Sequence, residues 1–345
     1  MTQLTSPSES ARAVANWFLS DQFNNPEKPL GSVSLLLAEE GDQLFETPKG
    51  DQSKIADANS HNVGEAITDW VTLCNKHPDN LAIFYFSGHG LASGAAMSLL
   101  LSDFGAKEFN PLEGAVDLQN LQNGVETCRA GNVMWIIDAC RSRSPLVSER
   151  SSRGMVPIIP DRKRRKGLPE IQAHSYYSTL QGAQSYGKKG KASEFTEAFL
   201  KALGGYAADK SEGKWWVDTG RVAEIVQKFA RSWYRGQSLL QKPESGRQSD
   251  FRICQAKTKS GIIDAFVTTR DRDSWQYVRL EHSHHIEGIN AVHGTDLLAA
   301  DKGMWEVQLT EKEIYSFKAS WHAVAGKEDS EDQRYIQPPF VLVEL

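Results

Sequence analysis

The stretch Leu81-Ala-Ile-Phe-Tyr-Phe-Ser-Gly-His-Gly90 decides the fold, because an apolar run ends abruptly in small residues and a histidine. A second apolar run, Val133-Met-Trp-Ile-Ile137, ends in the same way in Asp138-Ala-Cys-Arg-Ser142. Short continuous apolar runs are typical of strands buried on both faces of a parallel sheet. Because the carboxyl ends of parallel strands meet at one edge of the sheet, we expect His89 and Cys140 to be neighbours there.

A cysteine and a histidine in this arrangement suggest nucleophilic catalysis. The thiolate, rather than the thiol, attacks a carbonyl, so Cys140 needs a nearby base, and His89 can supply it. Each residue alone has a plainer explanation. A cysteine at a strand end is usually a small buried hydrophobe, as we interpret Cys74 and Cys128, and a lone histidine is usually a loop residue. The pair at two strand ends, flanked by glycines, favours a cysteine–histidine peptidase.

The two motifs resemble those of the caspase-like cysteine peptidases, in particular the bacterial relatives of metacaspases. Ser87-Gly-His-Gly90 is similar to the His-Gly motif of that family, and residues 138–142 are similar to its Asp-x-Cys-x-Ser motif. The resemblance covers about residues 8–254. It implies a hydrolase of the thiol protease class with His89 and Cys140 as catalytic residues. It also implies that the backbone N–H groups of Gly90 and Cys140 form the oxyanion hole, and that a backbone carbonyl orients His89.

Asp138 is the candidate substrate-binding residue. Positions i and i+2 of a strand point to the same face, so Asp138 and Cys140 can face one site. In the metacaspase-like branch that the chain resembles, an acidic residue here lines the pocket for an Arg or Lys side chain, and a carboxylate matches a guanidinium group well. We therefore expect cleavage after Arg or Lys. The alternative is that Asp138 caps the following turn or pairs with Arg141.

Residues 143–167 show no clear periodicity and are rich in Arg and Lys, which predicts an exposed loop. Members of the family that the chain resembles are cut after the catalytic cysteine, so Arg153, Arg165 and Lys166 are candidate processing positions. Residues 162–166 also resemble a nucleic-acid-binding patch, and a plain solvated charge run is the simpler alternative. The nucleic-acid interpretation is weak because the protein as a whole is acidic.

Helical and strand patterns alternate along the first part of the chain. This alternation predicts an α/β fold with a caspase-like, mostly parallel sheet flanked by helices on both faces. From about residue 258 the period becomes two, which predicts a small all-β, sandwich-like domain. We expect a peptidase domain over residues 1–256 and a β-rich accessory domain over residues 257–345. Expected helices include residues 8–18, 62–74, 118–128, 195–202 and 222–229, and residues 31–38 are an expected strand.

The start of the chain departs from the family pattern. Caspase-like domains usually begin with a central strand, but only seven residues precede the expected helix start at about Ser8, so the first strand is apparently missing. Ser6-Pro-Ser-Glu9 predicts a capping box at this helix, and Asn62-Val-Gly-Glu65 predicts another at the next one.

Composition excludes several classes of function. With 345 residues and a net charge of −5, the chain gives no support for a nucleic-acid or membrane partner. No apolar run approaches the roughly 20 residues that span a bilayer, and no secretory signal is visible. Four cysteines without paired spacing argue against a disulfide scaffold. We therefore expect a cytoplasmic protein whose partners are protein substrates and an upstream activating protease or sensor protein.

The Glu281-His-Ser-His-His285 segment invites a metal-site interpretation. A strand would project His285 away from His282 and His284, so a solvated strand end or turn is the expected structure. We predict no metal site and no cofactor. Calcium stimulates some metacaspases, but no acidic loop in this sequence identifies ligands for it.

Two functional hypotheses follow from these observations. The first is an endopeptidase that cuts after basic residues and is activated by cleavage in the basic loop. By analogy alone, such an enzyme would act in a regulated bacterial proteolytic pathway or in antiviral defence. The second is a catalytically inactive caspase-fold interaction or regulatory module, which the missing strand favours and the intact pair of His89 and Cys140 opposes.

Overall fold

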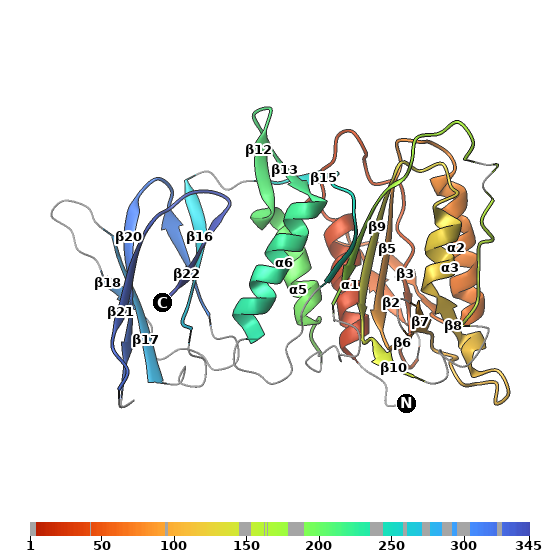
Figure 1. Ribbon diagram of the computed structural model, residues 1–345, viewed down its shortest axis with the longest axis horizontal. Coiled ribbons are helices and arrows are strands. Elements are labelled where there is room, and N and C mark those ends of the chain that lie inside the picture. Colours follow the sequence, from red (N-terminus) through yellow and green to blue (C-terminus); the bar gives the residue numbers. More distant parts are fainter. Residues whose placement is uncertain are drawn as a thin grey trace.

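The molecule has an α/β part and a C-terminal β-sandwich that lie side by side (Figure 1). The computed structural model describes residues 5–41, 43–93, 96–144, 153–161, 163, 165–178, 190–234, 244–257, 261–270, 277–284, 292–294, 304–322 and 326–345. None of the helices in these residues is both long and apolar enough to cross a membrane.

The central sheet has the strand order β14-β11-β9-β5. β5 (Leu81–Gly88), β9 (Asn132–Ala139) and β11 (Gln172–Tyr177) are parallel, and β14 (Glu244–Gln248) runs antiparallel to β11. Every residue of β9 is buried, as its continuous apolar run predicts. Within the described part of the chain, β5 is the last strand and has no partner on its outer edge.

Helices cover both faces of this sheet, as Figure 1 shows. Met134 and Ile136 of β9 pack with one group of helices, while Val133, Trp135 and Ile137 pack on the opposite face. The alternation follows from the two-residue period of a strand. The first group is α1 (Ser6–Leu19), α5 (Glu194–Lys201) and α6 (Thr219–Tyr234), and the second is α2 (Ser60–Cys74) and α3 (Leu118–Val125). The predicted α/β class is therefore confirmed.

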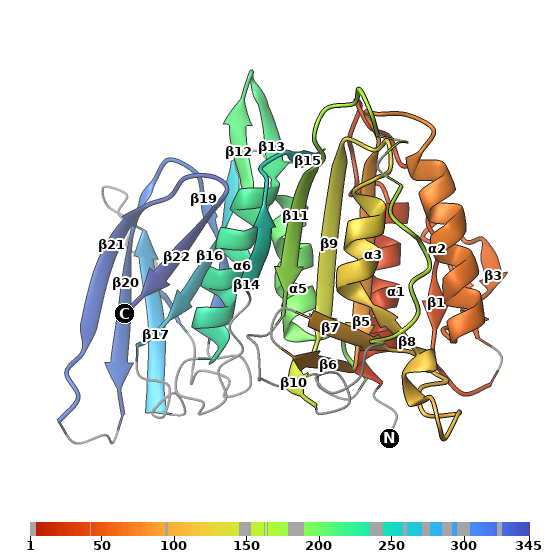
Figure 2. The same ribbon diagram turned by 45° about the vertical axis from the view of Figure 1, so that its right-hand side comes forward.

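A smaller sheet lies at the carboxyl ends of β5 and β9 (Figure 2). Its order is β10-β6-β7-β8, formed by β6 (Gly90–Ser93), β7 (Ala96–Leu100), β8 (Ala115–Asp117) and β10 (Ser142–Arg143). β10 pairs in parallel with β6, with Ser142 opposite Leu91. The two segments that carry the sequence motifs therefore stay together after they leave the central sheet.

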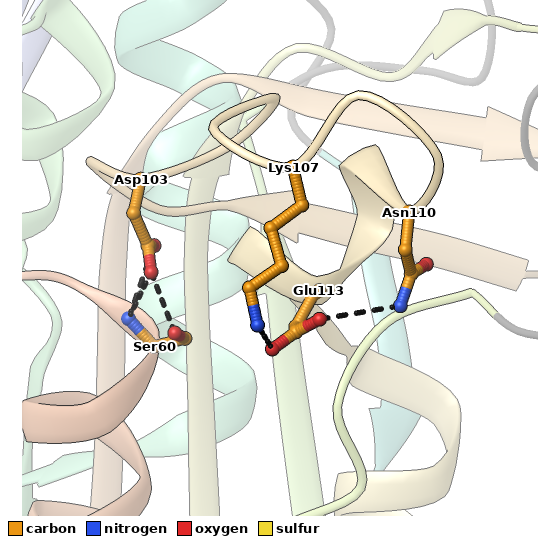
Figure 3. A network of polar contacts seen from close by, with 5 residues as sticks. All are labelled: Ser60, Asp103, Lys107, Asn110 and Glu113. Carbon is orange, nitrogen blue, oxygen red and sulfur yellow. Dashed lines mark hydrogen bonds and ion pairs between the residues drawn. The ribbon is translucent and has the colours of Figure 1, made fainter.

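The connection between β7 and β8 is fastened to the start of α2 (Figure 3). The Asp103 carboxylate accepts hydrogen bonds from the backbone N–H of Ser60 at 3.0 Å and from its hydroxyl at 2.5 Å. Lys107 forms an ion pair with Glu113 of the short helix η1 (Pro111–Gly114). Glu113 also accepts a hydrogen bond from Asn110, the residue just before that helix. The bonds of Asp103 tie the chain just after β7 to the start of α2, and the contacts of Glu113 lie within the connection itself.

Both predicted capping boxes are wrong in detail. α1 begins at Ser6, and its N-cap residue, Thr5, makes no side-chain capping bond. α2 begins at Ser60, because Asn59 accepts a bond from the N–H of Asn62 and so serves as the cap. Asparagine is as good an N-cap as serine, so a sequence with several polar residues near a helix start leaves the start ambiguous.

Two further strand predictions differ from the structure. In residues 31–38 only β1 (Leu36–Leu37) is a strand, paired with β4 (Ala56–Asp57), because residues 31–34 are exposed without strand partners. The hairpin of β12 (Ala208–Ser211) and β13 (Lys214–Asp218), which pairs with β15 (Arg252–Gln255), was not predicted. Its signal is the turn at 212–213, where Glu212 and Gly213 both have positive φ. A small hairpin of β2 (Leu44–Glu46) and β3 (Gln52–Lys54) was also missed.

The C-terminal part is a sandwich of two sheets, as predicted. One contains β16 (Ile262–Thr268), β19 (Trp305–Thr310) and β22 (Phe340–Glu344), and the other contains β17 (Val278–His284), β18 (Val292–Gly294), β20 (Ile314–Trp321) and β21 (Ser330–Tyr335). A separate apolar core, which includes Val267, Leu280, Phe317 and Val343, fills the space between them.

The sandwich packs on α6 and on η2 (Ala202–Tyr206), the turn that follows α5. The ring of Phe266 lies 5.2 Å from those of Tyr206 and Phe229, and the Tyr206 hydroxyl donates to Asp264 at 2.7 Å. Aromatic contacts and a buried hydrogen bond of this kind join the two parts through a continuous core rather than a wet surface contact.

Candidate active site

The pairing of β5 with β9 brings the two motifs together. Ser87 lies opposite Asp138, and Gly88 lies opposite Ala139 at the last positions of the parallel ladder. His89 and Cys140 are the next residue on each strand, and neighbouring strands lie about 4.8 Å apart. The structure therefore places the predicted histidine and cysteine side by side at the carboxyl edge of the sheet.

The backbone of His89 is held in place at the end of β5. Its carbonyl accepts the N–H of Leu100 at 3.0 Å, which fixes the chain between β5 and β6. Its Nε2 atom is buried and has no hydrogen-bond partner among the described residues. A buried ring nitrogen without a partner is costly unless it serves another group. This nitrogen is therefore well suited to exchange a proton with Cys140 or with a bound substrate.

Cys140 differs from the other cysteines in its surroundings. It is partly exposed, whereas Cys74, Cys128 and Cys254 are buried. Burial raises the pKa of Cys74 and of Cys254 to about 12. Such thiols stay protonated near neutral pH and are poor nucleophiles. Among the four cysteines, Cys140 alone combines access with a neighbouring histidine.

Gly90 is required by close packing. A Cβ atom at this position would lie 2.4 Å from the carbonyl oxygen of Cys140 and 2.5 Å from the Cε atom of Met97. The crowding comes from the backbone of Cys140 and from the side chain of Met97 on β7. The backbone of Gly90 therefore lies close against the carbonyl group of Cys140, and the oxyanion hole at their N–H groups stays a prediction.

Asp138 is buried, with only 3% of its surface exposed. Its Oδ2 atom accepts hydrogen bonds from the hydroxyls of Ser193, of Thr196 at 2.9 Å and of Ser87 at 3.4 Å. Ser193 is also the N-cap of α5, because its side chain accepts from the N–H of Thr196 at 3.0 Å. The carboxylate therefore lies at the positive end of a helix dipole, which favours negative charge.

Ser193 and Thr196 were not among the predicted site residues. The available signal was the sequence Ser193-Glu-Phe-Thr196, which is typical of a helix start, with an N-cap serine and acidic residues in the first turn. That signal locates a helix but does not say which strand end the helix faces. Only the packing of α5 against β9 reveals the contact with Asp138.

Tyr85 extends this polar cluster. Its hydroxyl lies 2.7 Å from the Oγ1 atom of Thr196. Burial, and secondarily the nearby Asp138 carboxylate, raise the pKa of Tyr85, so its phenol stays protonated. The carboxylate, three hydroxyls around it and this phenol form one network at the end of the sheet.

The described residues of the basic loop are exposed or partly exposed, and several of them are bonded to or packed on the α/β part. Arg153 is exposed, but its carbonyl accepts the Ser98 hydroxyl at 2.5 Å. Met155 forms a bridge with Val116 of β8, and Ile158 packs on α3. This part of the loop is therefore anchored to the α/β part by backbone and apolar contacts.

The other two candidate processing positions differ from each other. The Arg165 guanidinium donates to the carbonyls of Cys128 and Pro169, and burial lowers its pKa. Lys166 is exposed. Residues 162 and 164 of the basic patch lie outside the described residues.

The histidine segment of the sandwich is not a solvated strand end. His282 is 9% exposed, and its ring lies 5.2 Å from Trp305 and 5.4 Å from His293. Burial lowers its pKa to about 4, with a smaller effect from His293. His284 stacks on Tyr315, and residue 285 lies outside the described part. In the part of the chain that the structure describes, no group of three or more His, Cys, Asp and Glu residues is arranged to hold a metal ion.

Comparison with known proteins agrees with this geometry. A family model described as a caspase domain matches residues 1–249. The chain is also 26% identical, over 233 residues, to a protein of Sinorhizobium fredii that is described as uncharacterized. That alignment covers 63% of this chain and 66% of the relative, so just under two thirds of the relative's length is matched.

Proposed function

The chain belongs to the caspase-domain family, and from this premise we propose that it is a cysteine endopeptidase that cleaves proteins after Arg or Lys through Cys140 and His89. The observation that carries the proposal is the strand register, which ends in Gly88 opposite Ala139 and so puts the two residues side by side. The partial exposure of Cys140 and the buried, unpartnered Nε2 of His89 among the described residues support it further.

In the proposed reaction, the Cys140 sulfur attacks the carbonyl carbon of the scissile bond while its proton passes to Nε2 of His89. The backbone N–H groups of Gly90 and Cys140 stabilise the oxyanion. His89 then donates the proton to the leaving nitrogen as the C–N bond breaks. Water attacks the thioester, its oxygen bonds to the acyl carbon, the C–S bond breaks, and a proton returns to the sulfur.

The proposed preference for Arg and Lys rests on Asp138. Its carboxylate lies two residues before the nucleophile, and the hydroxyl groups of Ser193 and Thr196 donate to it. A pocket with such a carboxylate attracts a guanidinium or ammonium group and repels an acidic side chain.

Activation by cleavage in the basic loop is part of the proposal, and Lys166 is its favoured position. Arg165 is engaged with two carbonyls and the backbone of Arg153 is bonded to Ser98, whereas Lys166 is exposed. Incubation of the pure protein followed by intact-mass analysis tests this choice. Lys166→Gln should remove the processed form, whereas Lys163→Gln, another exposed lysine of the loop, should leave it.

A regulated bacterial proteolytic pathway, or antiviral defence, is the proposed setting by family analogy. The proposed partners are protein substrates and an upstream protease or sensor protein.

The decisive experiment measures hydrolysis of fluorogenic peptides that end in Arg, Lys or Asp, with calcium or with a chelator. Wild type is compared with Cys140→Ala and with Cys254→Ala, which removes a buried thiol far from His89. Cleavage after Arg or Lys that is lost only in Cys140→Ala supports the whole proposal. Cleavage after Asp overturns the specificity and keeps the peptidase. No cleavage, even after trypsin has cut the basic loop, favours the inactive interaction module.

A further inference from the structure

The direction of each hydrogen bond around Asp138 can be derived by counting protons. A carboxylate only accepts, so Ser193 and Thr196 each donate their single hydroxyl proton to its Oδ2 atom. The Thr196 hydroxyl has then no proton left for Tyr85, so the phenol of Tyr85 must donate to Thr196 at 2.7 Å. The result is a directed chain from Tyr85 through Thr196 to the carboxylate.

This chain fixes the carboxylate through hydroxyl donors. Thr196 is fully buried and Ser193 is 5% exposed, so water does not compete for these bonds. These hydroxyl donors are neutral, unlike an arginine or lysine partner, so the bonds orient the carboxylate and add no positive charge of their own. Both hydroxyls lie at the start of α5, so the orientation of the carboxylate is tied to a rigid helix and not to a loop.

We infer that Thr196, with Ser193, is a positioning residue that holds the Asp138 carboxylate for a basic substrate side chain and thereby sets the strength of the preference for Arg or Lys. The inference rests on the proposed function and adds residues to its specificity site. Thr196 acts through Asp138 and does not itself need to touch the substrate.

Thr196→Val tests the inference, because valine keeps the branched shape and removes the hydroxyl. The readout is the ratio of kcat/KM for two peptides that end in arginine or in citrulline, its uncharged analogue. Partial unfolding lowers both values equally and leaves the ratio unchanged. We expect Thr196→Val to lower the ratio about tenfold, the effect of one hydrogen bond to a charged group, and Thr196→Ser to restore it.

Thr219→Val is the matched control. Thr219 is also fully buried, and its hydroxyl lies within donating distance of an aspartate, Asp250, at 3.1 Å and of the Ser249 carbonyl at 3.0 Å. Thr219 lies beside Ser249, and the N–H of Ser249 donates to the carbonyl of Ala173 at the start of β11. Cys140 lies at the opposite, carboxyl end of the sheet, so Thr219 is remote from it. The control should lose stability and keep the wild-type ratio. A wild-type ratio in Thr196→Val, with a loss of stability like that of Thr219→Val, would overturn the inference.

Binding of the same two peptides to the full-length Cys140→Ala protein separates this inference from the proposed function. A preference for the arginine peptide that Thr196→Val removes supports the inference even where wild type cleaves nothing, and only the proposed activity then fails. Cleavage by wild type without preference for arginine over citrulline refutes the inference and keeps the peptidase. Equal binding of both peptides together with no cleavage refutes both.

Discussion

The α/β part and the β-sandwich each bury a titratable side chain, Asp138 and His282, in opposite kinds of surroundings. Hydroxyls and a helix N-terminus surround Asp138, and the donors offset the cost of burying its charge. Aromatic rings surround His282, and its buried Nδ1 atom has no hydrogen-bond partner among the described residues. The first arrangement supplies hydrogen-bond donors to a buried carboxylate, while the second keeps an imidazole neutral at the cost of sensitivity to acid.

The largest expected loss of stability comes from removing an aromatic side chain that packs between the α/β part and the β-sandwich. Phe266 is fully buried between the sandwich and the rings of Tyr206 and Phe229. Phe266→Ala should cost about 3–5 kcal/mol of unfolding free energy, because it leaves a cavity in a shared core. Urea unfolding followed by tryptophan fluorescence measures the loss. Phe109→Ala, at a side chain that is 91% exposed, should leave the stability unchanged.

The next prediction concerns the response of His282 to pH. Its pKa is about 4 in the folded protein and about 6.5 when unfolded, so the unfolded chain binds more protons between these values. Its contribution is therefore fully present above pH 6.5 and is lost as the pH falls through 4, up to roughly 3 kcal/mol. Urea unfolding at pH 7.5 and pH 4.5 measures this loss.

His282→Gln should show a smaller loss of stability over the same pH interval than wild type. His77→Gln is the control, because the side chain of His77 is 63% exposed, and it should keep the wild-type dependence. Equal pH dependence in wild type and His282→Gln would mean that the sandwich does not hold this imidazole neutral.

A smaller loss of stability is expected when the charge of Asp138 is removed. Asp138→Asn keeps the shape and weakens the bonds from Ser193 and Thr196, since hydrogen bonds to charged groups are stronger than neutral ones by about 1–2 kcal/mol. Thermal unfolding should show a modest loss, and the arginine-to-citrulline ratio should fall at least about tenfold. Asp103→Asn, at the surface contact with Ser60, should leave the ratio unchanged. An unchanged ratio in Asp138→Asn would mean that the carboxylate only anchors α5.

The smallest effect is expected for Tyr85→Phe. This change removes the phenol that donates to Thr196 and should cost about 1 kcal/mol of stability, the net value of one buried hydrogen bond. The arginine-to-citrulline ratio should fall less than in Thr196→Val, because the bond from Thr196 to Asp138 is retained. A larger fall than in Thr196→Val would place the phenol itself against the substrate.

Part of the fold could be predicted because its signals are local or follow from strand geometry. The apolar runs ending at Phe86 and Ile137 become adjacent strands, and their parallel pairing brings His89 to Cys140. Helix starts were less certain, because Thr5, Ser6, Asn59 and Ser60 are all polar, and neighbouring backbone contacts select among such residues. Of the strand expected at residues 31–38, only β1 forms. A strand needs a hydrogen-bonding partner, and the sequence of a segment does not indicate which other segment will pair with it.

The sequence by itself identified His89 and Cys140 as candidate catalytic residues and predicted that they meet at one edge of the sheet, since motif composition and strand period are local properties of the chain. It also indicated two parts of different class, because a period of two over residues 305–323 differs from the helical spacing before it. The surroundings of those residues were decided by tertiary structure alone. Ser193 lies far along the chain from Asp138, and His282 reaches Trp305 only through the packing of the two sheets. Burial and hydrogen-bond partners depend on contacts between distant segments, and these contacts supply the donors to a carboxylate and keep an imidazole neutral.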